Sequence, residues 1–391
     1  MRTTYPTVTP ALVHACVGLT LRRYLRLPDF SARCSADVLW TVLLYAAARL
    51  TSLAAACVAL LGAPSDTTLH DALCATLPAF AELQRRLNRA LQGDLPRAVR
   101  RRPQPLALDL TLIPYHGRPH RAAAEVYRSQ PRSGTSHFHA YATAYVVRKG
   151  LRFTVALTAV YQGEALADVV RRLLAQAAKA SVRPRYLLLD RGFCSVDVIR
   201  YLQAGRRAFL MPLPRRGRTE GHPRGPSGTR VFAAWKRSGW GRYTLTNAAG
   251  RTATVSVCVK CRNRRGERGR HGREALLYAY GRLRPSSYDW VRQTYRSRFA
   301  IETSYRQLHQ ARVRTSTRDP LRRLLFVGLA LVLRNVWVWL HWEVLSAPRR
   351  GGRLVVLARL RLRQMLRWLQ QVAEARFGMW DSIPAQRLAR E

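Results

Sequence analysis

Residues 106–117 read LALDLTLIPYHG, and the pattern of the chain changes at this stretch. Leu106, Leu108, Leu110 and Leu112 occupy every second position, and Asp109 belongs to the alternate set. A period of two is typical of a β-strand. Asp109 is therefore expected on the face opposite the leucines, where a carboxylate in mid-strand needs a partner or a metal ion.

Strand and helix patterns continue beyond this first strand. The expected strands are 137–147, 152–161, 185–190 and 208–211, and the expected helices are 164–180 and 196–204, the second capped by Ser195. The short apolar run 185–190 is typical of a strand inside a parallel sheet. Three hairpin-type strands followed by alternating helices and strands predict an α/β fold, a mixed sheet with flanking helices.

Residues 213–289 have a different composition. Two basic loops, 214–230 and 262–273, flank segments expected to be antiparallel strands, at 235–246, 251–259 and 276–282. Helices are expected again at 288–312, 320–345 and 354–375. The predicted parts are a helical N-terminal domain (1–102), the first part of the core (103–212), a β-rich basic insertion (213–289), the rest of the core (290–346) and a basic helical tail (347–391).

The N-terminal part contains a helix, a Gly/Pro turn at 62–65 and a second helix at 66–77. This order resembles a helix-turn-helix, so this domain could bind DNA ends. A helical hairpin that serves packing or dimerisation has the same pattern, and the sequence leaves both interpretations open.

The charge of the chain indicates a polyanionic partner. The 391 residues include 67 Lys and Arg but only 22 Asp and Glu, a formal net charge of +45. Only four of the basic residues are Lys. Arg binds phosphate bidentately, and neutralised phosphates release counterions. We therefore expect double-stranded DNA as the partner.

Other protein classes fit poorly. The first ten residues lack the apolar core of a signal peptide, and seven scattered cysteines are typical of a reduced protein. The apolar stretches 38–62 and 324–345 each contain an Arg, so we expect buried helices and no membrane partner. The expected location is the cytoplasm of a bacterium or archaeon, in association with the nucleoid.

Two further carboxylates stand out in a chain with few acids. Asp190 follows the buried strand 185–190 and precedes Arg191, at the kind of strand end where open α/β sheets place their sites. A helix N-cap is the alternative for Asp190. Glu302 lies in the expected helix 288–312, where helical spacing puts Tyr295, Arg298, Arg306 and His309 within about 40° of it. A solvated face with an Arg–Glu pair is the alternative there.

Asp109, Asp190 and Glu302 come from a strand, a strand end and a helix. Such a set can bind two divalent ions about 3.5–4 Å apart, of which one activates a nucleophile and the other stabilises the leaving oxygen. Carboxylates are the ligands that Mg²⁺ and Mn²⁺ prefer. We therefore expect two Mg²⁺ or Mn²⁺ ions bound by these three residues.

Residues 105–345 resemble the insertion-sequence DDE transposases that carry the signature Y-x2-R-x3-E-x6-K. Tyr295, Arg298 and Glu302 match this signature, and His309 stands where the family has Lys. The segment 190–193 (DRGF) and the strand that carries Asp109 also resemble the family's pattern. The 111 residues between Asp190 and Glu302, the second and third carboxylates, leave room for a β-rich insertion in a ribonuclease H-like core.

The resemblance implies cut-and-paste DNA transposition by a homodimer, with Asp109, Asp190 and Glu302 as the catalytic and metal-binding triad. Water cleaves the transposon end, and the freed 3′-OH attacks the opposite strand to form a hairpin and later attacks target DNA. Tyr295, Arg298, Arg306, His309 and Arg191 are the expected DNA-binding residues. Because a His is mostly neutral near pH 7, Arg306 or Arg312 could supply the charge that the family's Lys carries.

Several weaker signals remain. A hairpin requires an unstacked base, and Trp235, Trp240 and Trp290 are candidates to hold it, although packing in a small β core is favoured for each. Cys258 and Cys261 form a lone CxxC to which His271 would add one ligand, too few for zinc. His137 and His139 share a strand face near Asp109, where packing or a DNA contact is favoured over metal binding.

Three hypotheses follow. The first is a metal-dependent transposase, the second a ribonuclease H-like nuclease or resolvase without strand transfer, and the third a non-catalytic DNA-binding protein derived from a transposase. Metal-dependent cleavage separates the first two from the third, and strand transfer separates the first from the second.

Overall fold

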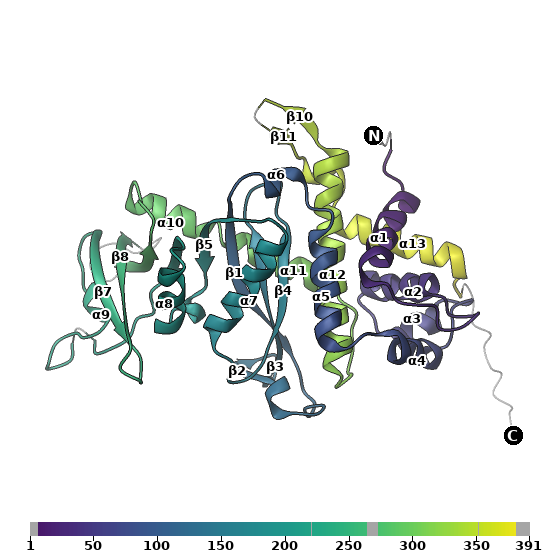
Figure 1. Ribbon diagram of the computed structural model, residues 1–391, viewed down its shortest axis with the longest axis horizontal. Helices are drawn as coiled ribbons and strands as arrows, with labels where there is room; N and C mark the ends of the chain where they lie inside the picture. Colours follow the sequence, from purple (N-terminus) through teal and green to yellow (C-terminus); the bar gives the residue numbers. More distant parts are fainter. Residues whose placement is uncertain (1–6, 220, 264–272, 351, 381–391) are drawn as a thin grey trace, which may run out of the picture. The chain divides into compact units, whose positions relative to one another are not determined.

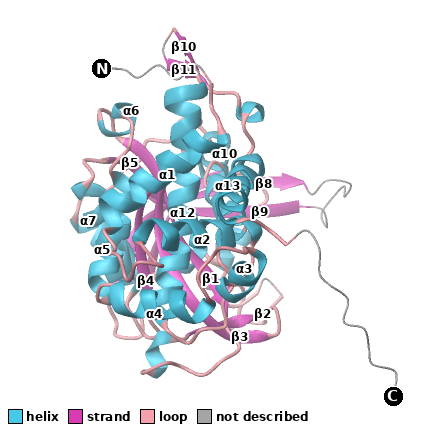
Figure 2. Ribbon diagram, turned by 90° about the vertical axis from the view of Figure 1, so that its right-hand side faces the viewer, coloured by secondary structure: helices cyan, strands magenta, loops and turns pink. Residues whose placement is uncertain are grey.

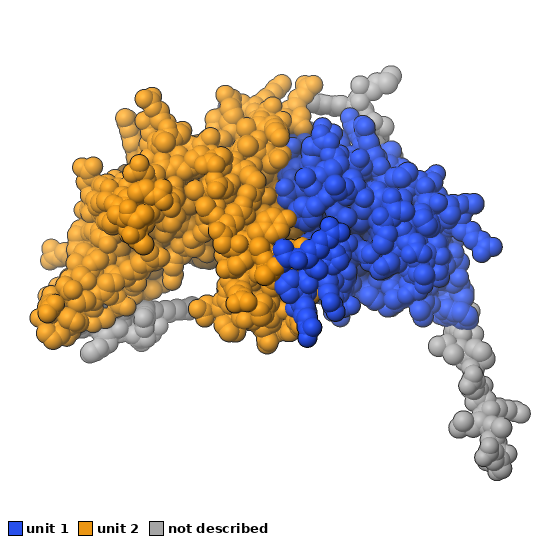
Figure 3. All heavy atoms as spheres, turned by 60° about the horizontal axis from the view of Figure 1, so that its bottom comes forward, with its two compact units in different colours: residues 1–96, 117–122, 304–391 blue, residues 97–116, 123–303 orange. Residues whose placement is uncertain are grey.

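The computed structural model describes residues 7–219, 221–263, 273–350 and 352–380. Two compact units divide the chain (Figure 3). Unit 1 comprises Met1–Pro96, Gly117–Ala122 and Ser304–Glu391, and unit 2 comprises Arg97–His116 and Ala123–Thr303. Most of the predicted loop 262–273, and the end of the predicted tail from 381 onward, lie outside the described residues. The five predicted domain boundaries stay a prediction.

Unit 2 is built on one mixed sheet with the strand order β2–β3–β1–β5–β6–β9–β8–β7, in which β4 also pairs with β3. Figure 1 shows β7 and β8 at the left-hand end of the picture. β1 pairs antiparallel with β3 and parallel with β5. The antiparallel pair of β6 and β9 joins the predicted β-rich segment to the core, so this segment continues the core sheet. The strands are β1 (Gln104–Pro114), β2 (Tyr127–Arg132), β3 (Thr135–Val146), β4 (Thr154–Val160), β5 (Pro184–Leu189), β6 (Phe209–Pro212), β7 (Gly239–Thr246), β8 (Thr252–Asn263) and β9 (Arg273–Gly281).

Short and medium helices accompany this sheet. α7 packs against β3 and β4, and α8 packs against α7. Ser195 caps α8, as expected, because its hydroxyl accepts a hydrogen bond from the Val198 N–H at 3.4 Å. The helices are α6 (Arg97–Arg100), α7 (Leu166–Lys179), α8 (Val196–Ala204), α9 (Arg230–Ala233) and α10 (Tyr288–Arg296), with 3₁₀ turns at Ala123–Glu125 and Arg191–Phe193.

The prediction of one helix over 288–312 is wrong. The chain forms α10 and then α11 (Phe299–His309), with a break at Ser297 and Arg298. The Ser297 hydroxyl donates to the Thr294 carbonyl at 2.7 Å, and the Ser297 N–H also bonds within the last turn. A serine side chain that satisfies a carbonyl in this way competes with the continuing helix. α11 is divided between the units, with Phe299–Thr303 in unit 2.

The described residues of unit 1 form helices and one small hairpin, β10–β11. Figure 2 shows α1, α2, α12 and α13 in cyan and the hairpin in magenta. The apolar stretch 38–62, which was expected to form a buried helix, contains two helices, α2 and α3, bent by 102°. Leu50 ends α2 with φ 56°, and the Ser52 hydroxyl caps α3. The elements are α1 (Pro10–Leu25), α2 (Ala36–Arg49), α3 (Leu53–Ala59), α4 (Asp66–Thr76), α5 (Phe80–Gln92), α12 (Pro320–Trp339), a π-helix (Leu340–Leu345), β10 (Ala347–Arg349), β11 (Gly352–Leu354), a 3₁₀ turn (Leu357–Arg359) and α13 (Leu362–Phe377).

α12 is the core helix of unit 1. With its π-helical continuation it is long and apolar enough to cross a membrane, but 94% of the apolar window is buried inside the protein. α12 packs on α5 so closely that a Cβ at Gly328 would lie 2.4 Å from a methyl carbon of Leu87. Glycine at this position therefore allows the close approach of the two helices.

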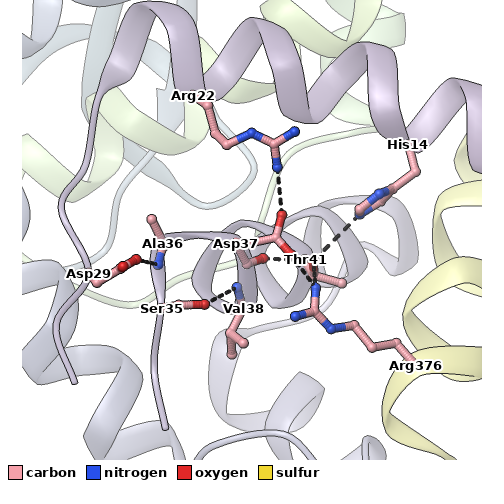
Figure 4. A network of polar contacts seen from close by, with 9 residues as sticks. All are labelled: His14, Arg22, Asp29, Ser35, Ala36, Asp37, Val38, Thr41 and Arg376. Atoms are coloured by element: carbon pink, nitrogen blue, oxygen red, sulfur yellow. Dashed lines mark hydrogen bonds and ion pairs between the residues drawn. The ribbon is translucent and has the colours of Figure 1, made fainter. Parts of the chain in front are cut away.

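A polar cluster ties three helices of unit 1 together (Figure 4). Asp37, at the start of α2, accepts hydrogen bonds from Arg22 of α1 at 2.7 Å and from Arg376 of α13 at 2.5 Å. The carboxyl side chain is 41% exposed. Burial raises the pKa of Asp37, but the hydrogen bond and charge of Arg376 and the charge of Arg22 outweigh it, so the pKa is lowered.

Candidate active site

Two carboxylates are brought together by the parallel pairing of β1 and β5. Leu108 on β1 pairs with Leu189 on β5. Asp109 and Asp190 are the next residues of these two neighbouring strands, so they occupy adjacent positions across the sheet. Asp190 lies where β5 ends, before the 3₁₀ turn that begins at Arg191. Its carboxylate makes no capping hydrogen bond to that turn, which leaves the side chain available for other partners.

The break between α10 and α11 adds a cation to this pair. Arg298 lies at the break, and its side chain is only 6% exposed. One guanidinium nitrogen donates to Asp109 Oδ2 at 3.0 Å, and the other lies 2.9 Å from Glu302 Oε1 and 3.5 Å from Asp190 Oδ1. One guanidinium thus contacts all three of the carboxylates that were expected to act together.

Aromatic rings flank the same guanidinium. The Arg298 Cζ lies 5.5 Å from the centroid of the Tyr295 ring and 5.4 Å from that of the Phe299 ring. Both distances lie within the range of a cation–π interaction. Burial raises the pKa of Tyr295 well above its usual range, so its hydroxyl stays protonated. Tyr295, Arg298 and Glu302 therefore form one contact group in unit 2.

The three carboxylates differ in their surroundings. The Asp109 side chain is 12% exposed, whereas those of Asp190 and Glu302 are 44% and 46% exposed. Burial raises the pKa of Asp109 to about 7, with Asp190 and Glu302 adding to the rise and Arg298 opposing it. Asp109 is thus a buried acid that holds its proton to near-neutral pH despite its ion pair with Arg298.

The three carboxylates match a hard divalent cation in ligand chemistry and in charge, but not in their spacing around Arg298. Three carboxylates and one guanidinium leave a local charge of 1 − 3 = −2 when all are ionised. Carboxylate oxygens are the ligands of Mg²⁺ and Mn²⁺. In the part of the chain that the structure describes, no three His, Cys, Asp or Glu side chains stand close enough together to hold one ion. The three carboxylates surround the Arg298 guanidinium.

A cavity of about 630 Å³ lies beside this group in unit 2. Five arginines line it, namely Arg191, Arg215, Arg262, Arg292 and Arg296. Three aromatic residues, Tyr278, Tyr295 and Phe299, also line it. The lining carboxylate, Glu274, is paired with Arg262 at 2.8 Å. Such a cavity is suited to an anionic ligand with apolar surface.

Comparison with known protein families decides the family. Residues 100–336, or 237 of the 391 residues, match the family model described as a transposase DDE domain.

The chain belongs to the DDE transposase family.

The predicted family is therefore confirmed, and with it the coarse function of a DNA transposase. No curated protein sequence matches the chain. Among solved structures, the chain is similar to a cryo-EM structure titled as a piggyBac transposase synaptic complex with hairpin DNA. The TM-score is 0.57 at 10% identity, over 96% of this chain and 82% of that one. This likeness concerns the fold, and it confirms the expected ribonuclease H-like α/β class.

The remaining predicted DNA-binding residues of this DDE transposase lie in different places. Arg191 lines the cavity, next in sequence to Asp190. Arg306 and His309, exposed on the second half of α11, are counted with unit 1. Partial burial and the charge of Arg312 lower the pKa of His309, so its imidazole is neutral at pH 7. The roles of these residues stay predictions.

The weaker candidates have other surroundings. Trp240 stacks on Tyr288, with ring centroids 4.7 Å apart, and Trp235 packs against Phe232. His139 is buried against the Tyr115 ring. The Cys261 thiol donates to the Trp235 carbonyl at 3.3 Å. His271, the third ligand considered for a zinc site, lies outside the described residues.

The arginines of the cavity were not singled out from the sequence, apart from Arg191. Arg292, Tyr295, Arg296 and Phe299 follow one another at helical spacing, so a stripe of cations and rings was visible in the sequence. Arg215 and Arg262 come from distant segments that only the sheet brings to the same cavity. In a chain with 63 arginines, no local signal distinguishes these two from the rest.

Proposed function

We propose that Asp109, Asp190 and Glu302 are the catalytic and metal-binding triad of a cut-and-paste DNA transposase. The observation that carries the proposal is their convergence on one guanidinium. A strand, a strand end and a helix contribute one carboxylate each, in a chain whose acids are outnumbered three to one by basic residues. The family match supports the reaction class.

The proposed reaction is hydrolysis of a phosphodiester at the transposon end. The oxygen of a water molecule bonds to phosphorus, the bond from phosphorus to the 3′ oxygen breaks, and that oxygen takes up a proton to leave a 3′-OH. This hydroxyl then attacks the opposite strand to form a hairpin, and after the hairpin opens it attacks target DNA. Two divalent ions, when bound, supply nucleophile activation and stabilisation of the leaving oxygen.

The residues of the chain have distinct tasks in this scheme. Asp109, Asp190 and Glu302 would hold the ions, and the buried position of Asp109 excludes water from one side. Tyr295, Arg298 and Arg191, with Arg306 and His309 farther along, would hold DNA phosphates. The partner is double-stranded DNA, both transposon ends and target, bound by a homodimer.

The test is cleavage of DNA that carries this gene with its native flanks, incubated with the purified protein and Mn²⁺. We expect discrete cuts at two flanking ends by the wild type and none by Glu302→Gln. Glu82→Gln is the matched control, because Glu82 pairs with Arg85 and Arg86 on α5 of unit 1, outside the proposed triad. Cleavage by Glu302→Gln at the wild-type rate would contradict the proposed triad.

A second substrate separates the transposase from a nuclease or resolvase. A pre-cleaved end with a free 3′-OH should be joined to target DNA by the wild type. Cutting without joining would favour the ribonuclease H-like nuclease or resolvase. Salt-sensitive binding without either reaction would favour a non-catalytic DNA-binding protein, with His309→Lys as the next variant to examine.

A further inference from the structure

We propose that Arg298 is the counter-ion of the carboxylates of Asp109, Asp190 and Glu302 and that a DNA phosphate draws it away, so that DNA and divalent metal bind cooperatively through this side chain. This inference rests on the proposed function. It concerns a step before catalysis, the exchange of one cation for another.

The first support is the geometry of the three ion pairs. The Arg298 guanidinium lies within 2.9–3.5 Å of an oxygen of each carboxylate. An ion that binds to the same oxygens competes with this guanidinium. The protein's own cation therefore lies on these oxygens, and a metal ion that binds them requires Arg298 to withdraw.

The second support is charge. One guanidinium balances one of the three carboxylates, and a deficit of two positive charges remains. Ionising the buried carboxyl of Asp109 is costly, whereas the carboxylates of Asp190 and Glu302 are nearly half exposed and partly solvated. The Arg298 guanidinium contacts all three carboxylates but does not neutralise their charge. A counter-ion that is later exchanged for a metal ion requires this property.

The third support is the incomplete bonding of Arg298 itself. The side chain is more than nine-tenths buried, yet its Nε–H finds no hydrogen-bond partner within the described residues. A buried donor without a partner is destabilising. The resting position of Arg298 is therefore not the one that best satisfies its donors.

The fourth support is the cavity beside the group. Tyr295 and Phe299, the rings that flank the guanidinium, also line this arginine-rich cavity. A DNA phosphate that enters there offers Arg298 a bidentate partner. Arg298 lies at the break between α10 and α11, and its backbone is held there by hydrogen bonds to Tyr295 and Ile301, so the withdrawal is a movement of the side chain. Withdrawal toward the cavity would free all three carboxylates at once.

Linkage between two ligands is reciprocal. If DNA removes Arg298 from the carboxylates, then bound metal must also increase DNA affinity by the same factor. Couplings of this kind commonly amount to about 5–150-fold. We expect at least a tenfold effect here, because three ion pairs are exchanged together.

The experiment measures Mn²⁺ binding from the EPR signal of free Mn²⁺, with and without a duplex DNA that carries non-hydrolysable phosphorothioate linkages. Mn²⁺ bound by the DNA alone is subtracted. Wild-type protein should bind Mn²⁺ at least tenfold more tightly when DNA is present. Arg298→Met should bind Mn²⁺ at least tenfold more tightly than wild type without DNA, and DNA should add little.

Arg171→Met is the matched control. Arg171 is exposed on α7 of the same unit, pairs with Asp168 and is not among the residues that line the cavity, so the variant removes the same charge away from the proposed site. It should keep the wild-type response of Mn²⁺ binding to DNA. Arg298→Lys keeps the positive charge but loses the bidentate guanidinium. It should increase Mn²⁺ affinity less than Arg298→Met does, and it replaces Arg298→Met in the experiment if that variant does not fold.

The outcomes separate this inference from the proposed function. If Asp190→Asn weakens Mn²⁺ binding but neither Arg298 variant tightens it, the triad stands and the counter-ion role is overturned. If Arg298→Met binds Mn²⁺ more weakly than wild type, Arg298 is a structural support of the carboxylates and not their competitor. If Asp190→Asn leaves Mn²⁺ binding unchanged, the proposed metal site itself fails.

Discussion

Two ion-pair clusters of this protein have opposite compositions. In unit 1, one carboxylate, Asp37, lies between two guanidiniums and joins three helices (Figure 4). In unit 2, one guanidinium, Arg298, lies among three carboxylates. The first arrangement is expected in a chain with 67 basic and 22 acidic residues, because each carboxylate can pair with more than one guanidinium. The second gathers scarce acids at one point and leaves them short of positive charge.

The difference separates a structural cluster from a candidate site. The Asp37 cluster carries a surplus of positive charge, is partly exposed and needs nothing more. The Arg298 cluster is short of two positive charges and includes a carboxyl whose pKa burial raises to about 7. A carboxyl whose pKa is strongly shifted by burial, beside a specific charge partner, marks a candidate functional site.

The largest expected effect is on cleavage. Asp190→Asn should reduce the cleavage rate by about 1,000-fold or more, as removal of a member of a catalytic group commonly does. Asp289→Asn is the matched control in the same unit, because Asp289 is exposed and pairs with Lys260. Gel-based cleavage kinetics measure the effect. If Asp190→Asn reduced the cleavage rate by less than tenfold, the Arg298 cluster would not be a catalytic site and would not differ in role from the Asp37 cluster.

The next effect is on the pH dependence of stability. The folded pKa of Asp109 lies near 7, above its ordinary value, so the folded protein binds this proton more tightly than the unfolded chain does. Its contribution to stability is therefore largest at low pH and is lost as the pH rises from about 4 to 7, by about 4 kcal/mol. Urea titrations give the free energy of unfolding at each pH. Its change between pH 4 and pH 7 should differ by that amount between the wild type and Asp109→Asn. The same pH dependence of the free energy of unfolding in both proteins would contradict a raised pKa of Asp109.

The structural cluster should respond with the opposite sign and a smaller size. The lowered pKa of Asp37 means that its contribution is present above the ordinary pKa of Asp and is lost as the pH falls through the folded value. Asp37→Asn should lower the free energy of unfolding by at most about 1 kcal/mol at neutral pH, because the pair is well exposed. Thermal denaturation should show the difference vanish in acid. A difference that persists in acid would point to packing and not to charge.

The smallest effect concerns His309, whose imidazole is neutral at pH 7. His309→Lys adds a charge where the family signature carries Lys, and one further phosphate contact should steepen the salt dependence of DNA binding by about 0.9 in log–log slope. Fluorescence anisotropy at several salt concentrations measures this slope. His222→Lys, which changes the net charge equally on an exposed loop, should change it less. Equal changes would mean that only net charge matters.

Most of the sheet was predictable because its pattern is local. The alternation around Asp109 and the apolar run before Asp190 follow from side-chain period and burial, and both segments are strands in the structure. The cap at Ser195 was predictable for the same reason. The break at Ser297 was not, because a serine within a helical pattern ends the helix only in some contexts. The short strand β2, exposed at most positions, has no apolar pattern to reveal it.

The sequence by itself determined the family, the strands of the core and the three carboxylates, because each depends on residue types at short spacing. It also determined the charge that favours DNA. Only the tertiary structure decided that Arg298, expected to hold phosphate, contacts Asp109, Asp190 and Glu302 together. That contact joins residues 189 positions apart. It depends on the parallel register of β1 and β5 and on the break before α11, and long-range register is set by the packing of the whole sheet and not by neighbours in sequence.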